Sequence, residues 1–231
     1  MARKSSYGQF CPVAKACEVF TERWTPLIVR EMIMGSQRFS DLHRGVPLMS
    51  RSLLSKRLQE LERAGVIERT ECEGGHEGYR LTPAGEELGP IVVQLGHWGK
   101  QWIRSEITPL ELDPSLLMWD MRRRIDLQQV PKNRVVVHFQ YHDAPIKRRR
   151  WWLMLNGPQE VDLCLVDPGV EPDLHVTTTV ETMTGIWMGD VSYGTALQSR
   201  DLKIEGPSDL RSRLPSWLKL SVFAEVERIV R

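Results

Sequence analysis

The stretch SRSLLSKRLQELERAGVIER, residues 50–69, constrains the fold of this chain more than any other. Ser50 is a favoured N-cap residue, because its hydroxyl can accept a hydrogen bond from an unpaired amide of the first helical turn. Gly65 can adopt the left-handed turn that commonly follows a helix. The apolar residues between these two ends recur at helical spacing and share one side: Leu53, Leu54, Leu58 and Leu61. The sequence therefore predicts a helix over 50–64 with a buried side and a polar side.

The segments on either side of this helix are also well marked. Proline and capping residues before it indicate helices at 13–23, 27–34 and 41–45. After it, residues 66–71 and 79–82 have the composition of strands and flank the glycine-rich loop CEGGHEG. A set of helices whose last member has an exposed polar side, followed directly by a β-hairpin, is typical of a winged helix-turn-helix.

The polar side of the predicted helix has the composition expected of a surface that enters the major groove of DNA. Residues 37–57 contain five basic side chains and only one acidic side chain, although the whole chain has a net charge of only +1. Any one of these side chains could equally be a solvated surface charge. Arg57 falls near the buried side of the helix, so its contact with DNA is the least secure of the set. We expect DNA contacts from Arg38, Arg44, Ser50, Arg51, Ser52, Ser55, Lys56, Arg57 and Gln59.

A long helical pattern runs from Ala84 to Ile107, and Pro90 marks the start of its straight part. Its apolar residues alternate at spacings of three and four, as in a coiled-coil seam: Leu88, Ile91, Leu95, Trp98 and Trp102. This seam either packs on its own domain or pairs with a second copy of the chain. A homodimer is the preferred interpretation, because a two-fold dimer sets the spacing of operator half-sites.

The proline-bearing segment 107–114 separates two kinds of pattern. We predict a DNA-binding and dimerisation domain over 1–106, a linker over 107–114 and a second domain over 115–231. In that second domain a helix near 116–127 precedes a four-stranded meander, which is followed by further helices and one short strand. The strands are expected at 134–141, 148–155, 160–166 and 173–180, the later strand at 201–206, and the later helices at 182–188, 192–198, 208–214 and 216–226. The fold class is α+β, with an N-terminal winged helix-turn-helix and a C-terminal α+β domain of the ligand-binding type.

Large aromatic and methionine side chains are frequent in the second half. Such residues belong more often to the core than to a pocket. If they do line a cavity, the cavity suits a flat or elongated apolar ligand. The candidate ligand-binding residues are Phe139, Trp152, Met154, Met183 and Trp187.

Taken together, the motifs resemble a known family. Residues 11–102 are similar to the HxlR-type winged-helix regulators in the Cys-Pro start, RWT, RFSDL, LSKRLQELERAGVI and the segment YRLTPAGEEL. Residues 115–220 resemble a sterol-carrier-protein-like domain through TGIWMGDVSYGTALQSRDLKIEGP. The resemblance implies a DNA-binding domain joined to a domain that binds an apolar ligand. The acidic, glycine-rich loop CEGGHEG departs from the usual basic wing of such regulators, which puts a minor-groove contact in doubt.

Cys11 precedes Pro12 at the predicted start of a helix, where unpaired amides stabilise a thiolate. The resemblance implies that a cysteine at this place senses oxidants or electrophiles. A cysteine packed beneath the dimer helix is an equally good interpretation, so Cys11 is a redox-sensing candidate only.

Other classes of function find little support in the residues. Cys72 and His76 offer only two ligands in a glycine-rich loop, so we predict no metal site and no cofactor. No nucleophile, phosphate-binding or zinc-hydrolase motif is present, which argues against an enzyme. The composition, the scattered cysteines and the lack of long apolar runs predict a cytoplasmic protein with no membrane association.

The sequence thus predicts a dimeric transcriptional regulator, a repressor, whose partners are double-stranded DNA and an apolar small-molecule effector. The alternative is a carrier of lipids or other apolar ligands in which the winged helix is a protein-interaction module. The basic stretch at 37–57 argues against that alternative, because the cores of protein interfaces are depleted of lysine.

Overall fold

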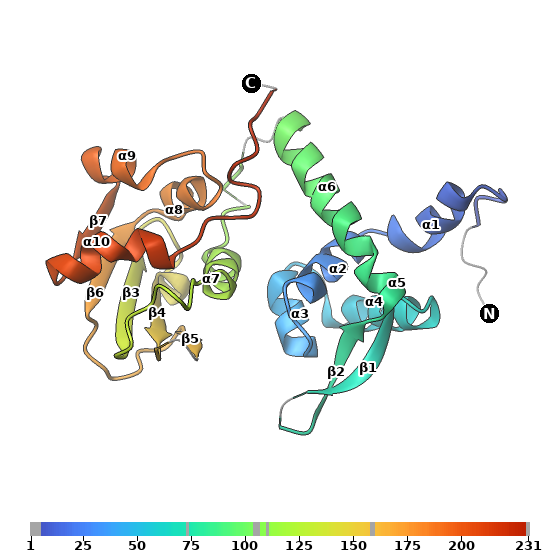
Figure 1. Cartoon of the computed structure of the whole chain (residues 1–231), viewed down its shortest axis with the longest axis horizontal. Helices are drawn as coiled ribbons and strands as arrows, with labels where there is room; N and C mark the ends of the chain where they lie inside the picture. Colours follow the sequence, from blue (N-terminus) through green and yellow to red (C-terminus); the bar gives the residue numbers. More distant parts are fainter. Residues whose placement is uncertain (1–5, 73, 104–106, 110, 158–159, 230–231) are drawn as a thin grey trace. The chain divides into compact units, whose positions relative to one another are not determined.

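The computed structural model describes residues 6–72, 74–103, 107–109, 111–157 and 160–229 (Figure 1). The chain divides into two compact units, Met1–Trp98 and Gly99–Arg231. Residues 104–106 and 110, which the sequence assigns to a helix end and to the linker, lie outside the described residues.

The first unit is a winged helix-turn-helix, as predicted. Ser50 Oγ accepts a hydrogen bond from Leu53 N at 3.3 Å, which caps the helix that follows. The described elements are α1 (Pro12–Phe20), α2 (Thr25–Ile33), α3 (Phe39–Gly45), α4 (Arg51–Arg63), β1 (Ile67–Cys72), β2 (His76–Leu81), α5 (Pro83–Glu86) and α6 (Leu88–Trp102). The strands β1 and β2 are antiparallel, and Ile67 pairs with Leu81. The leucine side of α4 is buried in the core of this unit together with Ile28, Leu42 and Ile67.

The long helix expected from Ala84 to Ile107 is not continuous. It is broken at Glu87, and α6 ends at Trp102. The position of Pro90 accounts for the start of α6, because a proline needs no backbone N–H in the first turn of a helix. The prediction that the straight part begins at Pro90 is therefore wrong by two residues.

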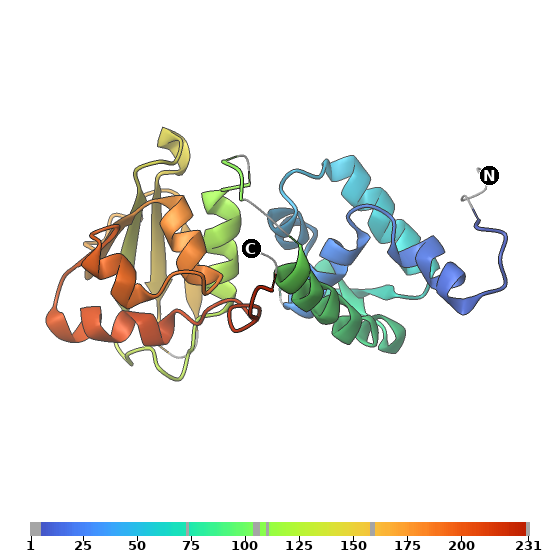
Figure 2. The same ribbon diagram turned by 90° about the horizontal axis from the view of Figure 1, so that it is seen from above.

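The second unit is a mixed sheet packed against helices, and Figure 2 gives a second view of it. Thr179 Oγ1 caps α8 by accepting from Thr182 N at 2.9 Å. The helical elements are α7 (Pro114–Arg123), the short 3-10 helix η1 (Ile146–Arg148), α8 (Val180–Trp187), α9 (Tyr193–Gln198) and α10 (Ser208–Trp217). The strands are β3 (Val135–Tyr141), β4 (Arg150–Leu155), β5 (Val161–Cys164), β6 (Leu174–Thr178) and β7 (Leu202–Glu205).

The predicted four-stranded meander is wrong. The sheet has five strands in the order β5-β4-β3-β6-β7, and β3 pairs with β6 in parallel. The chain reaches β6 through the segment that follows β5, so β6 lies beside the first strand rather than beside the last one. The short strand near 201–206 completes the sheet as β7.

The predicted helix at 216–226 is also wrong. After α10 the chain is extended or in turns, because tertiary contacts hold its backbone. Leu218 forms a β-bridge with Ile125, and Ser221 N donates to Trp187 O at 2.9 Å. Lys219 pairs with Asp126 at 2.9 Å.

The two faces of the sheet have different surroundings. Alternate residues of β3, β4 and β6 point into a core that is shared with α7, α8, α9 and α10. The residues between them point to the opposite face, which we call the outer face. No helix in the described part of the chain is long and apolar enough to cross a membrane.

Candidate nucleic-acid interface

Helix α4 has the two sides that its sequence predicts. Leu54 and Leu58 are fully buried, and Leu61 is nearly so. The opposite side is exposed and polar: Arg51, Ser52, Lys56 and Gln59. Ser55 is half-buried, and the exposed Ser50 is the N-cap residue. Hydroxyl, amide and ammonium groups of this kind can read base edges or bind phosphates.

Arg57 lies apart from this exposed side. Its side chain is only 12% exposed, and it pairs with Glu22 at 2.8 Å and with Glu60 at 2.5 Å. Both terminal guanidinium nitrogens therefore have acidic partners within the unit. A side chain held in this way ties α4 to the segment before α2 rather than presenting a free charge.

The other basic residues have different surroundings. The Arg51 guanidinium lies 5.2 Å from the centre of the Phe39 ring, which favours one orientation of the charged group. Arg44 pairs with Asp41 at 3.1 Å and remains largely exposed. Arg38, also exposed, directly precedes α3.

The sequence prediction omitted one basic side chain of α4. Arg63 is exposed, and no acidic group among the described residues forms an ion pair with it. Its position on the polar side of the helical pattern is the feature that could have identified it. It lies in the last turn of α4, at the opposite end from Ser50.

The wing is acidic in sequence, because residues 67–81 contain four glutamates and two arginines. Arg69 pairs with Glu62 at 3.2 Å and with Glu77 at 3.4 Å, and Arg80 pairs with Glu68 at 2.7 Å. Both arginines of the hairpin are therefore paired with glutamates and the hairpin has no net positive charge, consistent with the doubt raised by its sequence.

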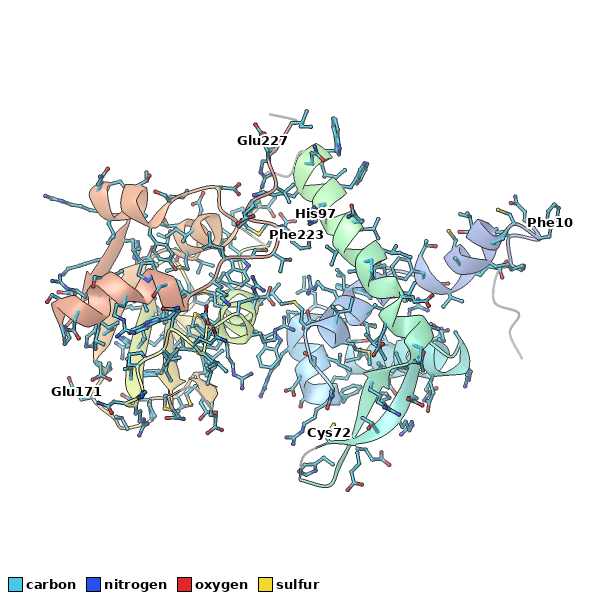
Figure 3. The ribbon with its side chains drawn as sticks, in the orientation of Figure 1. Phe10, Cys72, His97, Glu171, Phe223 and Glu227 are labelled. Carbon is cyan, nitrogen blue, oxygen red and sulfur yellow. The ribbon has the colours of Figure 1, made fainter. Side chains whose placement is uncertain are left out.

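Cys72, labelled in Figure 3 near the end of β1, is buried, with its Sγ 3.6 Å from Gln37 Oε1. A Cβ at Gly78 would lie 2.2 Å from that sulfur, so the hairpin needs glycine there. In the part of the chain that the structure describes, no three His, Cys, Asp or Glu residues are placed to hold a metal ion.

Helix α6 carries an exposed apolar stripe, made up of Ile91, Leu95, Trp98 and Trp102, each about half exposed. Leu88 does not belong to it, because its side chain packs against the core of the first unit. One residue of the predicted seam, Leu88, therefore packs in the first unit, and the other four are exposed to solvent.

Cys11 occupies the N-cap position of α1, directly before Pro12, and is half-buried. The neighbouring Phe10 is 99% exposed at the start of this helix (Figure 3). The geometry agrees with the expected helix terminus.

The predicted ligand-binding residues of the second unit do not share one surface. Phe139 and Met183 are buried in the core, and Trp187 packs against it. Trp152 and Met154 belong to the outer face, because they alternate with Leu153, a core residue. Trp152 lines a pocket on that face.

These features define a winged helix-turn-helix protein with the surface of a DNA reader. Residues 19–107 match the family model described as HxlR-like helix-turn-helix. The chain belongs to this family. It is 38% identical over 114 residues to the uncharacterized HTH-type transcriptional regulator YvaP of Bacillus subtilis, a match that covers 48% of this chain and 96% of that protein. It is 40% identical over 105 residues to the uncharacterized HTH-type transcriptional regulator Rv3095 of Mycobacterium tuberculosis, over 43% of this chain and 65% of that protein.

Among solved structures, the redox regulator HypR in its oxidized form is 33% identical, with a TM-score of 0.36, over 38% of this chain and 94% of that one. The reduced form of the transcriptional regulator YodB from B. subtilis is 28% identical, with a TM-score of 0.35, over 40% of this chain and 94% of that one. The relatives named as regulators support a DNA-binding regulator.

Proposed function

We propose that this protein is a sequence-specific, dimeric transcriptional regulator that acts as a repressor. The observation that carries the proposal is the exposed polar side of α4, with Ser52, Lys56 and Gln59 opposite its buried leucines. Side chains at this place on a helix-turn-helix can reach base edges in the major groove. Arg38, Arg44 and Arg51 are proposed phosphate contacts that fix the register of the helix on DNA.

The proposed dimer forms through the apolar stripe of α6. Its exposed indole and aliphatic side chains are costly to leave in water, and pairing with a second copy would bury them. A two-fold dimer would also present two copies of α4 to a palindromic operator.

We further propose that the Gly99–Arg231 unit is a sensor of the sterol-carrier-protein type that holds a small, mainly apolar effector. The last turn of α6 belongs to this unit, whereas most of α6 belongs to the first one. A ligand that prefers one arrangement of the dimer would then shift the population that binds the operator.

The test is fluorescence anisotropy of the full chain with DNA from immediately upstream of its own gene, compared with scrambled DNA, as salt is raised. A protein that contacts DNA phosphates and also recognises base sequence should bind the upstream DNA preferentially, and its log affinity should fall linearly with log salt concentration. Equal binding to both DNAs would contradict sequence-specific recognition of that site. Lys56→Gln should weaken binding, whereas Arg80→Gln, which removes a wing charge paired with Glu68, serves as the control.

A further inference from the structure

A row of chemically distinctive side chains crosses the outer face of the sheet in the second unit. The strand register places Trp152 opposite His138, His138 opposite His175, and His175 opposite Glu205. Directly paired residues point to the same face of a sheet. Residues from β4, β3, β6 and β7 that are distant in sequence therefore meet in one line.

The two histidines interact directly. His138 Nδ1 lies 3.3 Å from His175 Nδ1, so one ring nitrogen donates and the other accepts. Burial, His175 and Arg150, in that order, lower the pKa of His138, and Asp167 partly opposes them. His138 therefore offers a neutral hydrogen-bonding ring near neutral pH.

These rings form part of the lining of a pocket of about 330 Å³. The His138 and Trp152 ring centres are 4.9 Å apart with a tilt of 37°, which gives the pocket an aromatic floor. The loop between β5 and β6 forms its other wall, with Glu171 on that loop (Figure 3). A floor of this kind suits a planar ring, and the volume suits a small ligand.

The charges of the pocket narrow the class of ligand. Arg150 lines the pocket, is exposed, and has no ion-pair partner among the residues that the structure describes. A guanidinium can bind a carboxylate through two parallel hydrogen bonds. Asp167 faces the same pocket and accepts from Gly169 N through Oδ1 at 2.8 Å, which leaves its second oxygen for a donor on the ligand.

The acidic groups also exclude some anions. Asp167 and Glu171 both line the pocket, so a dianion such as a phosphate monoester would meet two negative charges as well as Arg150. A singly charged ligand that also carries a hydrogen-bond donor matches both signs of charge.

We propose that this pocket binds a small aromatic monocarboxylate with a hydrogen-bond donor on its ring. The ring lies on the His138–Trp152 floor, the carboxylate pairs with Arg150, and the donor faces Asp167. This ligand is more polar than the effector proposed above. Its role as the effector rests on the proposed function, whereas its binding to the pocket does not.

The experiment is isothermal titration calorimetry of the full chain, without DNA, using 4-hydroxybenzoate as the probe. We expect saturable binding of one molecule per chain. Three related molecules should each bind about tenfold more weakly or worse. The neutral 4-hydroxybenzamide lacks the negative charge, cyclohexanecarboxylate lacks both the aromatic ring and the hydroxyl donor, and phenyl phosphate lacks the hydroxyl donor and carries a second negative charge.

Arg150→Gln is the decisive variant, because an exposed side chain can be replaced without loss of the fold. It should weaken binding of 4-hydroxybenzoate about tenfold, the value of one charge-assisted contact. Lys147→Gln is the matched control: Lys147 is also exposed and belongs to the same basic run, but it does not line the pocket. It should change the affinity less than about twofold.

Absence of saturable binding, tighter binding of phenyl phosphate, or equal losses in the two variants would each overturn the proposal. A second measurement separates it from the function proposed above. If 4-hydroxybenzoate binds and Arg150→Gln weakens this binding as expected, but operator affinity does not change with ligand, the pocket assignment stands and the effector role of this ligand is overturned.

Discussion

Lys100 Nζ lies 2.5 Å from Asp190 Oδ1, and the same ammonium donates to Met188 O at 2.9 Å. The Lys100 side chain is only 4% exposed. Arg228 of the C-terminal segment also contacts Asp190, at 3.2 Å. The last turn of α6 is thereby fixed to the end of α8 and to the tail of the chain.

Lys100→Met should destabilise the Gly99–Arg231 unit by about 2 kcal/mol, because it removes the buried partner of a carboxylate while keeping the apolar stem. Urea unfolding followed by circular dichroism measures the change. Lys203→Met breaks an exposed pair with Glu205 and should leave the stability of the unit nearly unchanged. An equal loss in the two variants would show that the buried position of Lys100 has no special importance.

Arg57 and Lys56 are neighbours in sequence but should have separable roles. Lys56→Gln should weaken operator binding, reduce the slope of log affinity against log salt and leave stability unchanged, since it removes an exposed positive charge from the side of α4 that is proposed to contact base edges. Arg57→Gln should leave the slope unchanged and lower the free energy of unfolding by about 1 to 3 kcal/mol, since Glu22 and Glu60 lose their partner. Anisotropy at several salt concentrations, together with urea unfolding, checks both. A reduced salt slope in Arg57→Gln would mean that Arg57 contacts DNA after all.

Leu95→Arg should separate the proposed dimer. Leu95 is 49% exposed in the single chain, so the variant should still fold, but a charge in the paired stripe would be buried without a partner. Association should weaken about thirtyfold or more, as for an interface residue worth about 2 kcal/mol. Sedimentation equilibrium measures it, with Ile146→Arg as a control at a residue that is 83% exposed. A dimer unaffected by Leu95→Arg would exclude this stripe as the interface.

His138 should titrate below its ordinary pKa of 6.5, because burial and then His175 disfavour its charged form. The unfolded chain therefore takes up a proton at a higher pH than the folded one. The contribution of neutral His138 to the free energy of unfolding is complete above pH 6.5, and it is lost as the pH falls from there through the pKa of His138 in the folded chain.

Histidine NMR titration of the full chain measures this pKa. His175→Asn should raise it part of the way, because burial remains, whereas replacing the exposed His142 should not change it. A His138 pKa above 6.5 in the parent protein would contradict the neutral His138 described above.

The sequence by itself determined the winged helix-turn-helix. Its information is local: Ser50 caps the following helix, the leucine spacing selects the buried side of α4, and the glycine-rich loop joins two short strands. The same periodicity assigned the exposed polar side of α4. It also predicted most strands of the second unit, because β-branched and aromatic runs bounded by turns depend little on distant residues.

Tertiary structure alone decided which elements are neighbours. The parallel pairing of β3 with β6 brings His138 beside His175, and no spacing in the sequence indicates it. Glu22, 35 residues from Arg57 in the sequence, is an acidic partner of that arginine that the helical pattern of α4 does not indicate. Hydrogen bonds and ion pairs to distant segments hold the tail extended where its own pattern predicts a helix. Periodicity tells which side of an element is apolar, whereas the partner that covers it is chosen by packing and charge across the whole chain.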